Sequence, residues 1–542
     1  MSTRLKTLSL NQFTLLTAIF YVVIYNIPLF QVVAKGIAKQ SEVNWLFIGT
    51  MPLFLLFAFS FIFSLFSVKY LVKPFFIILT LASSGVFYAA WQYGIIFDYG
   101  MIVNVMQTNN AEAMTYLNWM SVLSFVITGV IPAYLMYRAN IEYKPFFKEL
   151  LHKVIFMIAM LIGIGLIAFV YYQNYVSFGR NNDQLKQNII PTYFIGSIAK
   201  YVNLNYIEKP LPFTQIGTDA KIVSQANNDK PNLFVMVVGE TARAMNYQYF
   251  GYHRDTNAYT KDLGMIPFMD TTSCGTATAV SVPCMFSKLD RANYDERHAK
   301  AQDTALDVLH HAGVKVYWLD NDSGCKGVCD RITHIEINTN SDPKLCNGEF
   351  CYDQVLVNKL KQVLSTLPEK NTNIVLHIIG SHGPTYYLRY PQSHRKFVPD
   401  CQKSDIQNCT HDELINTYDN TILYTDYILS EVVKLLQAEQ PKFNTAMMYI
   451  SDHGESLGES GMYLHGAPYA IAPKQQTHVP FLMWLPSQFA KANDINKQCI
   501  INEAKKGGYS QDNIFDTLLG TMHINSKDYT PKRDIFAACR TN

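Results

Sequence analysis

Residues 233–243 read LFVMVVGETAR, a run of six apolar residues that ends at Gly239 and Glu240. A short, continuous apolar run rich in Val is typical of a strand that is buried on both faces, as in a parallel sheet. Glu240 therefore places a carboxylate at the carboxyl end of a central strand. Ligands of parallel α/β sheets bind beyond the carboxyl ends of the strands, so this stretch predicts both a fold class and the position of a site.

Three further apolar runs, at 314–319, 374–379 and 446–450, predict strands of the same kind. Helical patterns lie between and after these runs, at 303–312, 353–366, 412–438 and 512–521. Alternating strands and helices favour a mainly parallel sheet that is covered by helices on both faces. The second part of the chain is therefore predicted to be an α/β/α sandwich.

Carboxylates and imidazoles follow three of the predicted strands. They stand in Gly-Glu-Thr-Ala-Arg, Gly-Ser-His-Gly-Pro and Ser-Asp-His-Gly-Glu-Ser, and a further histidine stands in Tyr-Leu-His-Gly; the residues are Glu240, His382, Asp452, His453 and His465. Zinc takes oxygen and imidazole nitrogen ligands of this kind. Each residue alone would be an ordinary polar loop residue, but three strand ends together predict a metal site.

A nucleophile is expected in residues 271–287, which read TTSCGTATAVSVPCMFS. Thr276, Thr278 and Ser281 are the candidate hydroxyls, close to the start of a predicted helix. A helix N-terminus stabilises an anionic phosphate and an ionised hydroxyl. A turn rich in helix-capping hydroxyls is the alternative interpretation, and for Thr276 and Ser281 it is the preferred one.

The first 175 residues have a different composition. They carry 15 of the 88 charged side chains and five long apolar runs, at 13–34, 44–67, 73–97, 121–138 and 154–173. About 20 apolar residues in a helix cross a bilayer core of about 30 Å. Five membrane helices are therefore predicted, and a single soluble globule or a disordered chain is excluded. The overall net charge of +2 gives no support for nucleic-acid binding.

Basic residues set the orientation of the five helices. Lys and Arg stand before the first run and in the loops after the second and fourth runs, whereas the loop at 98–120 has neither. The positive-inside rule places the N-terminus in the cytoplasm. Five crossings then place all residues after about 175 on the opposite side of the membrane.

All ten cysteines lie after residue 175. Their even number and close spacing predict disulfides outside the cytoplasm, between neighbours and between the last two: 274–284, 325–329, 346–351, 401–409 and 499–539. Cys325 and Cys329 could instead bind a metal, although structural zinc sites usually combine two such pairs. The predicted domains are 1–175 in the membrane, a bridge at 176–230 and a catalytic domain at 231–542. Within the bridge, 183–207 is either an amphipathic surface segment or a packing helix.

The motifs quoted above, extended to Ser-Val-Pro-Cys-Met-Phe, Ser-His-Gly-Pro-Thr-Tyr-Tyr and Ser-Asp-His-Gly-Glu-Ser-Leu-Gly-Glu, resemble those of the lipid A phosphoethanolamine transferases. These are the polymyxin-resistance enzymes of Gram-negative inner membranes. The resemblance covers the whole chain, including the five apolar runs and the cysteine spacing. It implies a five-helix transmembrane domain followed by a periplasmic α/β/α domain of the alkaline phosphatase (sulfatase-like) type.

The resemblance also implies a role for individual residues. Zn²⁺ would be bound by Glu240, Asp452, His453 and the nucleophile Thr278. His382 and His465 would hold the transferred phosphate or a second zinc. Substrate contacts are implied for Asn109 and Glu112 in the charge-poor loop, and for Ser323, Lys326 and His377. His377 lies inside a predicted strand, so a buried structural role is an equal alternative for it.

The implied reaction moves phosphoethanolamine from phosphatidylethanolamine to a phosphate of lipid A in two steps. Thr278 would carry the group in between, diacylglycerol would be released, and the modified surface would bind less polymyxin. The partners implied are these two membrane lipids, and the enzyme would be a monomer. The alternatives are transfer of phosphoglycerol or phosphoethanolamine to another periplasmic glycan or glycolipid, and an inactive membrane-anchored binding protein. A sulfatase is less favoured, because the Cys/Ser-x-Pro-x-Arg signature is missing after Cys274 and Cys284.

Overall fold

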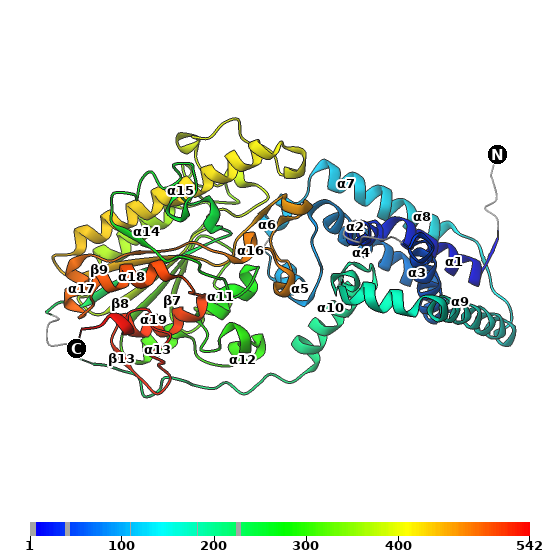
Figure 1. Ribbon diagram of the computed structural model, residues 1–542, viewed down its shortest axis with the longest axis horizontal. Helices are drawn as coiled ribbons and strands as arrows, with labels where there is room; N and C mark the ends of the chain where they lie inside the picture. The colour runs from blue at the N-terminus through cyan, green and yellow to red at the C-terminus, as the bar shows by residue number, and fades with distance from the viewer. Residues whose placement is uncertain (1–6, 38–43, 109, 182, 224–228, 542) are drawn as a thin grey trace. The chain divides into compact units, whose positions relative to one another are not determined.

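The computed structural model describes residues 7–37, 44–108, 110–181, 183–223 and 229–541 (Figure 1). The chain divides into two compact units. The first unit comprises Met1–Tyr99 and Leu117–Lys200, and the second comprises Gly100–Tyr116 and Tyr201–Asn542. The short segment Gly100–Tyr116, which carries most of helix α5 (Tyr99–Gln107) and all of α6 (Asn110–Thr115), therefore belongs to the second unit although it lies between apolar helices in the sequence.

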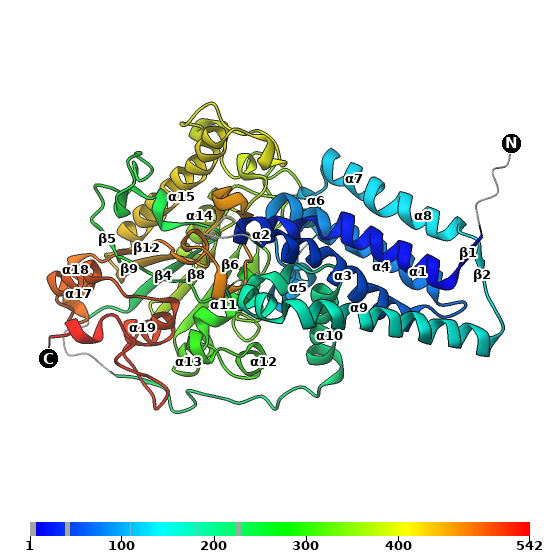
Figure 2. The same ribbon diagram turned by 45° about the vertical axis from the view of Figure 1, so that its right-hand side comes forward.

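The second unit is built on a seven-stranded sheet in the order β5-β12-β9-β4-β8-β6-β7, most of which can be followed in Figure 2. The strands are β4 (Asn232–Gly239), β5 (Met265–Pro267), β6 (Lys315–Asp320), β7 (Thr333–Glu336), β8 (Thr372–His377), β9 (Asn444–Ser451) and β12 (Phe481–Trp484). Strands β9, β4, β8, β6 and β7 run parallel. Strands β12 and β5 are antiparallel to their neighbours. The four strands predicted from the sequence are confirmed as β4, β6, β8 and β9.

Helices cover both faces of this sheet (Figure 1). On one face lie α14 (Gln354–Ser365) and α15 (His411–Glu439), and on the other lie α11 (Thr278–Phe286), α13 (Ala305–His311) and α19 (Ile514–Thr521). The core of the second face joins alternate residues of β4, such as Phe234 and Met236, to Val282 of α11, Leu306 of α13 and Leu518 of α19. Every residue of β4 and β9 is buried, as expected for central strands of a sheet covered on both faces.

Five disulfides close short loops in the second unit. They join Cys274 to Cys284, Cys325 to Cys329, Cys346 to Cys351, Cys401 to Cys409, and Cys499 to Cys539. The predicted pairing is confirmed for all ten cysteines. Cys325 and Cys329 are therefore bonded to each other, which excludes the alternative in which they bind a metal.

The first unit contains the apolar helices. Four of them are long and apolar enough to cross a membrane: α3 (Trp45–Phe66), α4 (Val72–Tyr93), the helix Trp119–Arg138 and the first part of α9, Phe146–Tyr175. The first predicted span is instead a bent pair, Leu10–Tyr25 and Ile27–Lys35, with an angle of 51°. Pro28 explains the break, because a proline has no N–H to donate and its ring clashes with the carbonyl four residues earlier. Counting this pair as one span gives the five that the sequence predicts.

The stretch after the last span is more helical than a simple linker. Helix α9 runs from Phe146 to Asn181, and α10 follows at Thr192–Val202. Most of α10 is solvent-accessible, but Phe194 and Ser197 are buried. The described part of the link to β4 continues with a π-helical turn at Asn203–Ile207 and the two-residue strand β3 (Lys221–Ile222), which pairs with β13 (Ile524–Asn525).

Candidate active site

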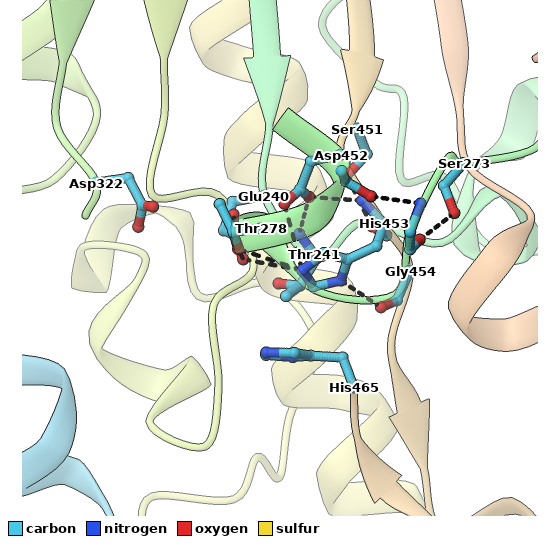
Figure 3. A network of polar contacts seen from close by, with 12 residues as sticks. Glu240, Thr241, Ser273, Thr278, Asp322, Ser451, Asp452, His453, Gly454 and His465 are labelled. Atoms are coloured by element: carbon cyan, nitrogen blue, oxygen red, sulfur yellow. Dashed lines mark hydrogen bonds and ion pairs between the residues drawn. The ribbon is translucent and has the colours of Figure 1, made fainter. Parts of the chain in front are cut away.

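Three potential metal ligands meet at the carboxyl ends of β4 and β9. The strands are adjacent and parallel, with Gly239 opposite Ser451, so the residues that follow them come together. Glu240, Asp452 and His453 are all completely buried, and each offers a ligand atom within 4.8 Å of the other two. Nε2 of His453 lies 3.5 Å from Oε1 of Glu240 and 3.3 Å from Oδ2 of Asp452 (Figure 3).

Thr278 completes this cluster from the first residue of α11. Its Oγ1 lies 3.2 and 3.1 Å from the two carboxylate oxygens of Glu240, to which it donates, and 3.4 Å from Nε2 of His453. Ala277 is the N-cap residue and has an extended backbone, so the chain enters the helix directly at Thr278. The positive end of the helix dipole therefore lies at the candidate nucleophile. The Cys274–Cys284 disulfide ties the preceding turn to the same helix.

The hydrogen bonds around the cluster leave one oxygen of Asp452 and one ring nitrogen of His453 available to bind a metal. Oδ1 of Asp452 accepts the backbone N–H groups of Thr241 and His453, at 3.2 and 2.6 Å. Oδ2 of Asp452 is buried and has no hydrogen-bond partner among the described residues. Nδ1 of His453 lies 2.9 Å from the carbonyl oxygen of Gly454, to which it can only donate, so Nε2 keeps its lone pair. An orphaned carboxylate oxygen beside such a nitrogen fits a zinc ion.

Burial also favours the neutral form of the histidine. It lowers the pKa of His453 to about 4, and the neighbouring Asp452 only partly opposes this. A metal ligand must be deprotonated, and His453 meets this condition at neutral pH.

His382 and His465 lie beside this cluster, as their sequence motifs predict. Both are buried, and their ring centroids are 5.9 Å apart. The ring of His465 is 4.4 Å from that of His453, and its Nδ1 is 3.4 Å from a carboxylate oxygen of Glu455. The structure therefore brings the two histidines next to the three strand-end ligands.

Ser323 and Lys326 connect to the cluster through Asp322. The ammonium group of Lys326 donates to the carbonyl and hydroxyl oxygens of Ser323, both at 2.8 Å, and the Ser323 hydroxyl donates to Asp322 at 2.9 Å. Burial alone would raise the pKa of Asp322. The positive charges of His377, His382 and Lys326 outweigh this effect and lower it to about 2. Asp322 is therefore a carboxylate at neutral pH.

A cavity of about 580 Å³ opens beside these residues. Its lining includes Asp322, Ser323 and His382 from the sheet edge, and Asn110 and Met114 from α6. Asn109 lies outside the described residues, and so does the side chain of Glu112. The described residues Asn110 and Met114 border the cavity, which is large enough for a lipid head group.

For His377 the sequence left a substrate contact and a buried structural role open, and it did not reveal the partners of this residue. The ring is completely buried at the end of β8, and its Nδ1 lies 3.0 Å from Oδ2 of Asp320. Asp320 and Asp322 follow the apolar run 314–319 in the sequence. Polar residues after the other three predicted strands are treated as candidate ligands. The same rule applied to the run 314–319 would have identified Asp320 and Asp322.

Asp353 is a third residue that the sequence did not reveal. Its carboxylate accepts the backbone N–H groups of Ile379 and Gly380 at 2.9 and 3.0 Å and the side-chain amide of Asn321 at 2.8 Å. It therefore fixes the loop that carries His382. No local motif marks Asp353, because its role depends on a contact between α14 and a loop that follows it in the sequence.

Comparison with known proteins gives two family matches. The model described as "Phosphoethanolamine transferase EptA/EptB" matches residues 55–206, and the "Sulfatase" model matches residues 232–524. The chain is 40% identical to phosphoethanolamine transferase EptA of Escherichia coli K12, over 99% of this chain and 98% of that protein. It is 36% identical to phosphatidylethanolamine transferase Mcr-1 of Escherichia coli, over 78% of this chain and 80% of that protein.

Solved structures give the same picture for the fold. The integral membrane lipooligosaccharide phosphoethanolamine transferase A of Neisseria meningitidis superposes with a TM-score of 0.95 and 37% identity, over 99% of this chain and all of that chain. The periplasmic domain of phosphoethanolamine transferase EptC from Campylobacter jejuni superposes with a TM-score of 0.52 and 45% identity, over 61% of this chain and 99% of that chain. Both the apolar helices and the sheet unit therefore have solved counterparts.

Proposed function

The chain belongs to the phosphoethanolamine transferase family, and from this premise we propose that it transfers phosphoethanolamine from phosphatidylethanolamine to a phosphate of lipid A. It is a transferase and a multi-pass protein of the bacterial inner membrane with its catalytic domain in the periplasm. The donor, the acceptor phosphate and the covalent step are our proposal, in which the enzyme acts as a monomer. Its sheet unit provides all the site residues from one chain.

The proposal rests mainly on the position of the Thr278 hydroxyl. The hydroxyl of Thr278 lies within hydrogen-bond distance of both oxygens of Glu240 and 3.4 Å from His453, in a buried cluster at the start of a helix. A nucleophile close to a base and to the positive end of a helix is the arrangement that covalent phosphoryl transfer requires.

Glu240, Asp452, His453 and Thr278 would hold a zinc ion. When bound, zinc lowers the pKa of a hydroxyl and stabilises negative charge on phosphoryl oxygens. The orphaned Oδ2 of Asp452 and the available Nε2 of His453 support this assignment.

In the first step, the oxygen of Thr278 attacks the phosphorus of phosphatidylethanolamine. The Thr278 proton passes to Glu240, which already accepts its hydrogen bond. The bond between phosphorus and the diacylglycerol oxygen breaks, that oxygen takes up the proton held by Glu240, and diacylglycerol leaves. Phosphoethanolamine then remains bonded to Thr278.

In the second step, a phosphate oxygen of lipid A attacks the same phosphorus. The bond to Thr278 breaks, and its oxygen takes up the proton that the attacking lipid A phosphate gives up. His382 and His465 would donate hydrogen bonds to the phosphoryl oxygens in both steps. Using one nucleophile twice lets two lipids occupy the site in turn, which gives ping-pong kinetics.

The cavity beside Asp322 would receive the lipid head groups. Asn109, Glu112, Ser323 and Lys326 are the residues that we propose contact them. Both substrates are lipids, which accounts for a catalytic domain joined to membrane helices. Phosphoethanolamine adds an ammonium group beside the lipid A phosphate, so cationic peptides such as polymyxin are attracted less strongly to the modified surface.

The test is mass spectrometry of lipid A from cells that express the chain. The proposal predicts a gain of one phosphoethanolamine unit, which is absent when the Thr278→Ala variant is expressed at the same level. Unchanged lipid A together with a modified periplasmic glycan would show that the acceptor is wrong.

A further inference from the structure

A second group of potential ligands lies on the opposite side of Glu240. Strand β4 is placed between β9 and β8, so Glu240 has Asp452 and His453 on one side and His377 on the other. An oxygen of Glu240, an oxygen of Asp322 and a ring nitrogen of His377 all lie within 4.8 Å of one another. Glu240 is thus common to two clusters, and Figure 3 shows Asp322 beside the first of them.

His377 is held in the orientation that a metal ligand needs. It lies opposite Asp320 in the register of β8 and β6, and its Nδ1 is 3.0 Å from Oδ2 of Asp320. The same oxygen accepts the indole N–H of Trp318 at 2.6 Å. Histidines that bind metals usually donate their second ring N–H to a carboxylate in this way.

The remaining nitrogen, Nε2, forms no hydrogen bond with the described residues but carries a proton. Burial lowers the pKa of His377, whereas Asp320 and Asp322 outweigh burial and raise it to about 9, so a bound cation would displace this proton. Nε2 is completely buried, has no hydrogen-bond partner among the described residues, and lies 3.8 Å from Oδ2 of Asp322. This separation is too long for a hydrogen bond. It fits two ligands that share an ion, because zinc ligands about 2.1 Å from the metal are about 3.4 Å apart at tetrahedral angles and about 4.2 Å apart on opposite sides.

The site also has an entry path. Asp320 and Asp322 both line the cavity of about 580 Å³ that opens beside the active site. An ion can therefore reach the group from the side on which the substrate is expected. There it would add positive charge close to the anionic phosphate that the reaction moves.

We propose that Glu240, Asp322 and His377 form a second divalent-cation site, which binds a transition-metal ion such as zinc or manganese and shares Glu240 with the first site. Asp320 is its positioning residue. Neither His382 nor His465 is a ligand of this site. Metal binding here does not depend on which group the enzyme transfers. The cation site can therefore be disproved while the proposed function holds, and the reverse is also true.

The test is the zinc content of the full-length protein in detergent. The protein is stripped with a chelator, dialysed against a fixed zinc concentration and analysed by inductively coupled plasma mass spectrometry. Asp322→Asn and His377→Gln are each expected to lose one zinc per chain relative to wild type. The matched control Asp330→Asn changes an exposed aspartate in the same segment and is expected to keep the wild-type value.

Two results would overturn the proposal. One is a folded Asp322→Asn protein that binds as much zinc as wild type. The other is a second zinc that disappears in His382→Gln and persists in Asp322→Asn. Because a change at a buried residue can prevent folding, wild-type crystals soaked in manganese give an independent measurement. An anomalous peak between Glu240, Asp322 and His377 supports the site, and a peak at Asp452 and His453 alone contradicts it.

Discussion

The hydroxyl oxygen of Thr278 lies 3.1 Å from one carboxylate oxygen of Glu240 and 3.2 Å from the other. The two residues are 38 positions apart in the sequence, one at the start of α11 and one at the end of β4. A nucleophile and a proton acceptor are therefore in contact before any substrate binds. The first three predictions below concern this contact or the structure that supports it.

Removing the nucleophile should stop the reaction without unfolding the protein. Thr278→Ala is expected to lower diacylglycerol release from fluorescent phosphatidylethanolamine by at least about 10³-fold, because it removes the oxygen that attacks the phosphorus. Thr276→Ala is the matched control two residues away. It removes one hydrogen bond, to the carbonyl of Ala467, and should keep most of the activity. Retained turnover in Thr278→Ala would show that another residue is the nucleophile.

The disulfide next to Thr278 should matter more for catalysis than an equally short disulfide elsewhere. Replacing both Cys274 and Cys284 by Ser is expected to destabilise the protein by about 2.5 kcal/mol, and so is replacing Cys401 and Cys409. Only the first pair holds the turn before the nucleophile. Its loss should therefore lower kcat at a temperature where both variants are folded. Equal effects on kcat would contradict this role.

The backbone at Gly380 should be needed for the position of Glu240. Gly380 has φ +48°, and an added Cβ would lie 2.8 Å from the carbonyl oxygen of Glu240. Gly380→Ala is expected to weaken zinc binding, measured by competition with a chelator. Gly313→Ala is the control, because Gly313 also has a positive φ, +89°, but has open space around it. Both changes strain the backbone by about 1 kcal/mol, and only the first displaces Glu240.

Stability should fall in mildly acidic solution because of His523. Burial and the positive charge of Arg540 lower the pKa of His523 to about 4, whereas the unfolded value is about 6.5. The unfolded state therefore takes up a proton first as the pH falls. The stabilising contribution is complete above about pH 6.5 and is lost between about pH 6.5 and pH 4.

Thermal unfolding against pH measures this effect. His523→Gln cannot be protonated, so its melting temperature should depend less on pH than that of wild type between pH 6.5 and 4. His298→Gln is the control, since His298 is exposed. Identical pH profiles for wild type and His523→Gln would contradict the assignment.

The central part of the fold could be predicted because its physical signal is local. Strands β4, β6, β8 and β9 are buried on both sides or nearly so, and they appear in the sequence as continuous apolar runs. Strand β7 is an edge strand with mostly exposed residues and gives no such signal. Strand β12 is buried and lies in the apolar run 481–485, so its signal was present in the sequence and was missed. The bend in the first apolar run was also missed, although Pro28 marks its place.

The sequence predicts those site residues that come directly after a strand. Glu240, Asp452 and His453 come directly after β4 and β9, and the order of the strands brings them together. Asp353 contributes through a contact with Ile379, 26 positions further along the chain, which no sequence spacing reveals. Asp322 also follows a predicted strand and could have been found in the same way. It is one of the three residues of the proposed second cation site.

The most direct test of the account is to look for the covalent intermediate itself. Purified full-length protein is incubated with phosphatidylethanolamine without lipid A, then digested and analysed by tandem mass spectrometry. The account predicts phosphoethanolamine on Thr278, and its disappearance when lipid A is added. Diacylglycerol release with an unmodified Thr278, or with the group on another residue, would contradict it.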